Sequence, residues 1–180
     1  MVGCRDAEIR VYDVPKEAPV AVAAHPSEHS GLGLTWTKPD SWTEKEATSF
    51  RLASYAARGE GDRAVDISVT AFPDSAGGLL ANINRWRGQL DLQPVDTAGL
   101  EDLVTEIIIA GHPGSYVDMT GLANDGDPSR IVGAILSIEG KTWFFKMTGS
   151  AEAVGSELAA FRELTSSVEA RETRVTEEAR

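Results

Sequence analysis

Polar side chains suited to binding a ligand are concentrated in one stretch of the sequence, directly after the pair Gly77-Gly78. They are two asparagines, two arginines and a glutamine: Asn82, Asn84, Arg85, Arg87 and Gln89. Free amides at a helix N-terminus bind anions, and arginine adds charge-assisted hydrogen bonds. The glycine pair lacks both the Gly-x-Gly-x-x-Gly pattern and the lysine of a phosphate-binding loop. We predict a ligand or partner site at these five residues; the alternative is that they hydrogen-bond to neighbouring loops and strand ends.

The histidines are weaker candidates. His25 and His29 are four residues apart with a glutamate between them, a spacing that suits zinc on a helix. A proline and small residues around them predict a linker instead, and a third ligand would have to come from elsewhere. His112 stands in a Gly-His-Pro-Gly turn near Ser115 and Asp118, but the chain has no G-x-S-x-G nucleophile motif. We expect an exposed turn histidine and no metal, cofactor or catalytic residue.

Aromatic side chains give a third possibility, a binding groove. The candidates are Trp36, Trp42, Trp143, Phe144 and Phe145. Consecutive aromatics in an alternating strand must point to both faces of a sheet. We therefore expect core packing on both sides, with a groove as the alternative.

Hydrophobic periodicity predicts the elements that position these residues. Period-two alternation predicts strands over residues 32–36, 49–56, 64–72, 106–110 and 115–121, and a hairpin of 130–138 with 141–147. A helix is expected over 79–90, with Leu79, Ile83, Trp86 and Leu90 as its buried stripe, followed by a helical turn over 100–104. One further helix runs from 149 to 168. This order predicts an α+β fold, an antiparallel sheet with helices packed on it.

Charge and cysteine content exclude several classes of protein. The 180 residues carry a formal charge of −11, spread over the chain, so no basic stripe is available for nucleic acid. A single cysteine excludes an intrachain disulfide framework and a cysteine-rich zinc site. No apolar run approaches the ~18 residues that span a bilayer.

That cysteine, Cys4, follows Gly3, and a small residue before cysteine is how a bacterial lipoprotein signal ends. Either the sequence begins near the mature end of such a protein or the cysteine is incidental. The stretch behind it, residues 18–30, is rich in alanine and proline and predicts a flexible tether. We expect a lipid-anchor and tether segment at 1–30, a single α+β domain at 31–168 and a frayed helix end at 169–180.

Two motifs resemble a group of uncharacterised bacterial lipoproteins. They are VDISVTAFPDSAGGLLANINRWRGQ, residues 65–89, and GKTWFFKMTG, residues 140–149. The start GCRDAEIRVYDVPKE is similar to the mature start of these proteins. The order of strands and helices also resembles the PsbP-like α-β-α sandwich. That resemblance implies a domain that binds protein partners and has no shared catalytic residues.

Two functional hypotheses follow. The first is a non-catalytic domain at the bacterial cell envelope, extracytoplasmic and lipid-anchored through Cys4, which binds a protein partner or small ligand. It would have no cofactor and would meet the membrane only through its lipid. The second is an enzyme of unknown reaction that uses polar residues near His112 or the helix from Asn82 to Gln89.

Overall fold

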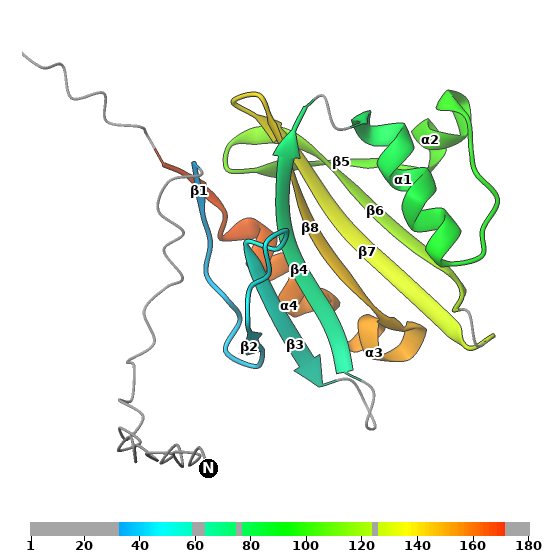
Figure 1. The fold of residues 1–180 in the computed structure, drawn as a ribbon, viewed down its shortest axis with the longest axis horizontal. Helices are drawn as coiled ribbons and strands as arrows, with labels where there is room; N and C mark the ends of the chain where they lie inside the picture. Colours follow the sequence, from blue (N-terminus) through cyan, green and yellow to red (C-terminus); the bar gives the residue numbers. More distant parts are fainter. Residues whose placement is uncertain (1–32, 59–63, 75–76, 124–125, 172–180) are drawn as a thin grey trace, which may run out of the picture.

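The computed structural model describes residues 33–58, 64–74, 77–123 and 126–171. Nine strands and four helices lie within these ranges (Figure 1). The first half of the chain contains β1 (Leu34–Thr35), β2 (Thr43–Lys45), β3 (Ala53–Arg58), β4 (Ala64–Pro73), α1 (Gly78–Gln89) and α2 (Thr97–Leu103). The second half contains β5 (Thr105–Ile109), β6 (His112–Leu122), β7 (Pro128–Ile138), β8 (Lys141–Ser150), α3 (Ala151–Ser156), α4 (Leu158–Ser166) and β9 (Glu169–Ala170).

Seven of the strands form one antiparallel sheet in the order β2-β3-β4-β8-β7-β6-β5. Helices α1 and α2 pack on one face, and α4 lies behind the other (Figure 1). This confirms the predicted α+β class. The order places β4 beside β8, so two strands that are far apart in the sequence form the middle of the sheet.

The central hairpin β7–β8 follows directly from its sequence. Its strands are joined by Glu139 and Gly140, both with positive φ, of 51° and 72°. Such two-residue turns match the right-handed twist of the strands they join. The predicted hairpin is confirmed at the predicted turn.

Two hydrophobic cores lie on the two faces of the sheet. Trp143 and Phe145 point into the larger core, under α3, α4 and the segment before β2. Phe144, between them, points to the α1 side. The five aromatics considered for a groove are all buried, so the expected core packing is confirmed.

Helix α1 packs closely on the sheet through the predicted stripe. Ile83, Trp86 and Leu90 are buried, and Leu79 packs against them. The Trp86 ring lies over the backbone of Gly133 in β7, where a side chain would overlap with it. This close approach fixes the height of the helix above the sheet.

The structure corrects three element predictions at the edges of the fold. The first strand is only Leu34–Thr35, and it pairs with β9 outside the main sheet. The strand expected from Ser49 begins at Ala53, and the edge strand β2 has no counterpart among the predictions, because three exposed residues carry no hydrophobic alternation. His112 opens β6 instead of lying in a turn, since the turn is at Ala110-Gly111.

The C-terminal end also differs from the prediction. The single helix expected over 149–168 is two helices, α3 and α4, that meet at Glu157. It also begins later than predicted, because β8 continues to Ser150. Glu169 and Ala170 form β9 and not a frayed helix end, because their backbone pairs with β1. Residues 1–32 and 172–180 lie outside the described part, and the boundaries of the tether and domain stay predictions.

Candidate functional site

Helix α1 covers only part of its face of the sheet. Its apolar stripe packs on β6, β7 and β8, and no helix of the described chain lies over β4, β3 and β2 on this side (Figure 1). Strand register directs a set of mostly polar side chains into this uncovered half. We name it the open sheet face and define it by Lys45, Ser54, Asp66, Ser68, Thr70, Phe72, Phe144 and Lys146.

Lys146 lies where the open sheet face meets α1. Its ammonium donates a hydrogen bond to Gln89 Oε1 on the last turn of the helix. The same Nζ lies 5.6 Å from the centroid of the Trp86 ring, a cation–π contact. The lysine is thus fixed between strand and helix.

Burial lowers the pKa of Lys146 from its ordinary value of 10.5 to about 8. Desolvation is the largest cause, because an ammonium loses hydration when it is covered. Arg51 lowers the pKa of Lys146 further, and Asp66 opposes both effects. The fold therefore places a cation where it is poorly hydrated.

The carboxylate of Asp66 is occupied by two other cations. Arg51 donates to both of its oxygens, at 3.0 and 2.9 Å, and Lys45 lies at 3.7 Å. Arg51 also donates to Ser54 Oγ at 3.1 Å. The hydrogen bond to Asp66 raises the pKa of Arg51. Asp66 attracts Lys146 from a distance, but its salt bridges go to Lys45 and Arg51, and no carboxylate of the described residues forms a salt bridge with Lys146.

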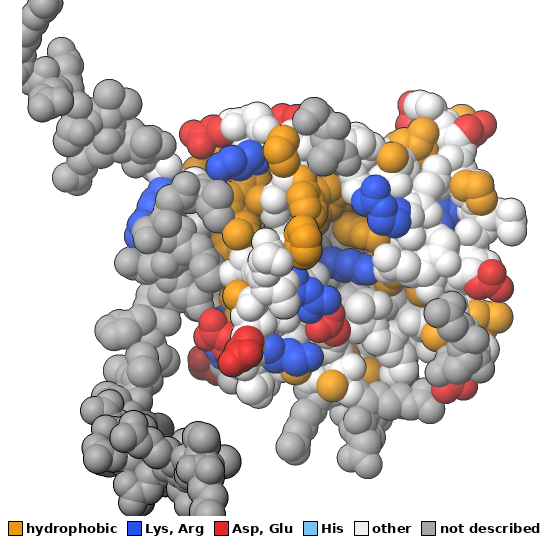
Figure 2. Space-filling view, in the orientation of Figure 1, with side chains coloured by type: hydrophobic (Ala, Val, Ile, Leu, Met, Phe, Trp, Pro, Cys, Tyr) orange, Lys and Arg blue, Asp and Glu red, His pale blue; other side chains and the backbone are white. Residues whose placement is uncertain are grey.

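An aromatic strip runs along the same face toward Lys146. Phe72 contacts Phe144 with ring centroids 6.2 Å apart, and Phe144 contacts Trp86 at 6.0 Å. Phe72 is 36% exposed, while Phe144 is buried. Figure 2 shows this side of the molecule, where hydrophobic side chains gather beside Lys and Arg groups in the middle of the view.

The structure separates the five predicted site residues into two groups. Gln89 reaches Lys146, so the flank of α1 that carries Asn82, Arg85 and Gln89 borders the open sheet face. Arg85 donates to Asn82 Oδ1 at 2.6 Å, and Asn82 donates to the Gly78 carbonyl at 2.7 Å. Arg85 is exposed and keeps further donors for a ligand.

The other flank of α1, which carries Asn84 and Arg87, hydrogen-bonds to the loop that follows the helix. Asn84 accepts from the Val95 amide and donates to the Val95 carbonyl, both at 2.8 Å. Arg87 Nε donates to the Gln93 carbonyl at 2.7 Å. Asn84 and Arg87 therefore hydrogen-bond to the backbone of the loop that follows the helix, which is the structural role given above as the alternative to a ligand site.

Lys146, Arg51 and Ser68 were not among the site residues predicted from the sequence. Asp66, Ser68 and Thr70 share the polar side of the strand predicted over 64–72, which was the available signal. Lys146 is a charged residue directly after the aromatic run Trp143-Phe144-Phe145, which was a second signal. Neither indicates a site until β4 and β8 are known to be neighbours.

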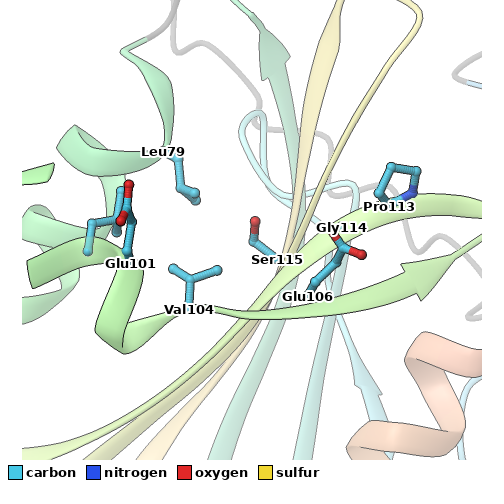
Figure 3. Close-up of a pocket in the computed structure, with 8 residues that line it drawn as sticks. Leu79, Glu101, Val104, Glu106, Pro113, Gly114 and Ser115 are labelled. Carbon is cyan, nitrogen blue, oxygen red and sulfur yellow. The ribbon is translucent and has the colours of Figure 1, made fainter. Parts of the chain in front are cut away.

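A second hollow lies at the other end of α1. Leu79, Leu100, Val104 and Ser115 line an open pocket of about 380 Å³ between α1, α2, β5 and β6. Figure 3 shows Ser115 pointing between Leu79 and Gly114, with carboxylates from Glu101 and Glu106 on the rim. None of the described residues that line this pocket is basic.

His112, the proposed catalytic alternative, is exposed at the start of β6. Its side chain has no hydrogen bond or ion pair with the rest of the described chain. Within the described ranges, no group of three or more His, Cys, Asp or Glu side chains is placed to hold a metal ion. Cys4, His25 and His29 lie outside those ranges, so the lipidation and zinc expectations are not addressed by the structure.

The chain is similar to several solved structures at low identity. A protein from Bacteroides thetaiotaomicron covers 78% of this chain with 15% identity and a TM-score of 0.47, and this chain spans only 46% of its length. LpqN of Mycobacterium tuberculosis, a protein involved in cell envelope biogenesis, covers 78%, with 86% of LpqN matched, 10% identity and a TM-score of 0.48.

A third similar structure is the PsbP of Synechocystis sp. PCC 6803, which covers 77% of this chain, with 87% of that protein matched, 11% identity and a TM-score of 0.49. PsbP is the fold that the sequence resembles. At these identities and scores the similarities carry no argument about function. No family model and no curated protein matches the sequence. None of the described helices is long and apolar enough to cross a membrane.

Proposed function

We propose that this protein is a non-catalytic binding domain of the bacterial cell envelope, lipid-anchored through Cys4, whose open sheet face receives a protein partner or small ligand. The observation that carries the proposal is the position of Lys146. A half-buried cation without an ion-pair partner in the described chain is unfavourable for folding, and perturbed groups of this kind cluster at functional sites.

The surroundings of Lys146 support the same surface. Arg85 and Gln89 on α1, with Lys45 and Arg51 beside β3, line an uncovered half of a rigid sheet. The seven-stranded sheet that carries the site holds these side chains in place, which lowers the entropy lost on binding. An anchored domain with such a face suits capture of a molecule near the membrane.

Site-directed cross-linking tests this proposal. Phe72 on the open sheet face is replaced by p-benzoylphenylalanine in the membrane-bound protein, and Glu163, exposed on α4 behind the sheet, is replaced likewise as the control. We expect a discrete covalent adduct from position 72 and none from position 163. A small ligand would instead co-purify with the detergent-extracted protein in native mass spectrometry.

Charge reversal provides the matched control. Arg85→Glu should abolish the adduct or the co-purified mass, whereas Arg162→Glu, on an exposed position of α4, should leave it unchanged. Equal adducts from both cross-linking positions, or neither an adduct nor a ligand, would overturn the proposal.

A further inference from the structure

We infer that the ligand of the open sheet face is an organic anion with an apolar body, whose carboxylate or phosphate is bound by Lys146 and Ser68 while its apolar part lies on Phe72. This inference rests on the proposed function and specifies the chemistry recognised by the same surface.

Lys146 has N–H donors that the described chain does not use. An ammonium has three N–H donors, and in the described chain one goes to Gln89 while the Trp86 ring faces the charge. The one carboxylate of the open sheet face, Asp66, is bound by Arg51 and Lys45. An incoming oxyanion would therefore supply the acceptor that the protein does not.

Ser68 places a hydroxyl beside the Lys146 ammonium. Ser68 pairs directly with Lys146 across β4 and β8, so their side chains share the face with Cβ atoms about 5 Å apart. Ser68 is 8% exposed, and its hydroxyl has no hydrogen-bond partner in the described chain. Buried polar groups are normally satisfied, and one oxyanion between these two side chains satisfies both.

The charged side chains around Ser68 and Lys146 are mostly cations. Four cations, Lys45, Arg51, Arg85 and Lys146, surround the open sheet face, with Asp66 among them and Asp74 at its Phe72 end, in a chain whose formal charge is −11. A local surplus of cations on an acidic protein favours an anion and disfavours a cationic ligand. Arg85, exposed on the α1 flank, can reach the outer oxygens of the same group.

Two phenylalanines, Phe144 and Phe72, form an apolar surface next to Lys146. Phe144 is two residues before Lys146 on the same face of β8, about 7 Å along the strand. Phe72 lies beyond it, with ring centroids 6.2 Å apart, and is 36% exposed. A ligand whose anionic group meets Lys146 would therefore place an attached apolar body along this strip and cover Phe72.

Four small probes test the inference by ¹H–¹⁵N NMR titration of the whole protein. They are 4-phenylbutanoate, its neutral amide, acetate and 3-phenylpropyl phosphate. We expect the two amphipathic anions to bind at the amides around Ser68 and Lys146, at least tenfold tighter than the amide or acetate. Preference between them distinguishes a carboxylate from a phosphate ligand.

Three variants assign the contacts. Lys146→Met should reduce the affinity for 4-phenylbutanoate to that of its amide, and Ser68→Ala should weaken it about threefold with the fold unchanged. Phe72→Ser should weaken 4-phenylbutanoate without affecting acetate. Arg162→Met, which removes a cation behind the sheet, should change none of these values.

Two outcomes would overturn the inference. One is equal affinity for the anion and its amide; the other is an unchanged affinity in both Lys146→Met and Ser68→Ala. If the probes fail while the Phe72 cross-link persists in Lys146→Met, the open sheet face binds something other than an anion and the proposed function stands. If the cross-link and the co-purified ligand are also missing, the proposed function fails as well.

Discussion

The indole ring of Trp86 lies directly on the backbone of Gly133, and a Cβ atom at that position would overlap with the ring. The contact sets the height of α1 above β7. It also aims the flank with Arg85 and Gln89 toward the open sheet face, where Trp86 and Gln89 hold the Lys146 ammonium. The Trp86 side chain therefore takes part both in the packing contact with Gly133 and in the candidate site at Lys146.

The first prediction concerns that contact. Gly133→Ala should lower the free energy of unfolding by about 2–3 kcal/mol, because the new methyl group pushes the indole and the helix outward. Gly88→Ala, on the same helix with no atom within 4 Å of the added carbon, should raise it by about 0.5–1 kcal/mol. Urea unfolding measures both. Equal effects of the two alanines would show that α1 does not rest on Gly133.

The second prediction concerns the pH dependence of stability. The pKa of Lys146 is about 8 in the folded protein, against an ordinary 10.5, so the unfolded chain binds more protons between these values. Stability from this group therefore rises as the pH increases from about 8 to 10.5, and below pH 8 its charge is a constant cost.

Lys146→Met should remove that cost. We expect a gain of roughly 1 kcal/mol at pH 7, because the relief of desolvation exceeds the lost hydrogen bond to Gln89 and the cation–π contact. The difference between the two proteins should shrink above pH 8. Chemical denaturation at pH 7, 8, 9 and 10 measures it, and a variant that is less stable at pH 7 would contradict the prediction.

The third prediction separates the two flanks of α1. Asn84→Ala loses both hydrogen bonds to Val95 and should cost about 1–2 kcal/mol of stability. Arg85→Ala, an exposed position, should change stability by less than about 0.5 kcal/mol. Thermal unfolding compares the two. A large loss for Arg85→Ala would mean that this arginine is structural and unavailable to a ligand.

The fourth prediction concerns the anchor. Cells that express the full-length gene product should incorporate radiolabelled palmitate into it, and Cys4→Ala should abolish the label. The variant should also leave the membrane fraction, because the lipid on Cys4 is the proposed means of attachment. A label that persists in Cys4→Ala would refute acylation at this residue.

Local patterns in the sequence were sufficient for the central elements. Residues 64–72 alternate with period two, and strand β4 follows them almost residue for residue. The stripe of Ile83, Trp86 and Leu90 predicted which face of α1 is buried. Short edge elements such as β2 and β9 were not predictable, because their two or three residues are stabilised by pairing partners and not by their own pattern.

Only part of the candidate site could be predicted from the sequence. The spacing of Asn82, Arg85 and Gln89 on one flank, and of Asn84 and Arg87 on the other, follows from the helical period. Which flank meets the open sheet face depends on where the helix lies over the sheet. That position is set by Gly133, a residue in a distant strand.

For this protein, the sequence by itself determined the class of fold, the inward and outward faces of the main elements, and the two-residue turn at Glu139-Gly140, because each depends on residues within a few positions of one another. Only the tertiary structure decided that Ser68 and Lys146 are opposite each other, at the border between the part of the sheet under α1 and the part that no described helix covers. Pairing between β4 and β8 joins segments far apart in the chain, and the choice of partner strand is made by the packing of the whole sheet.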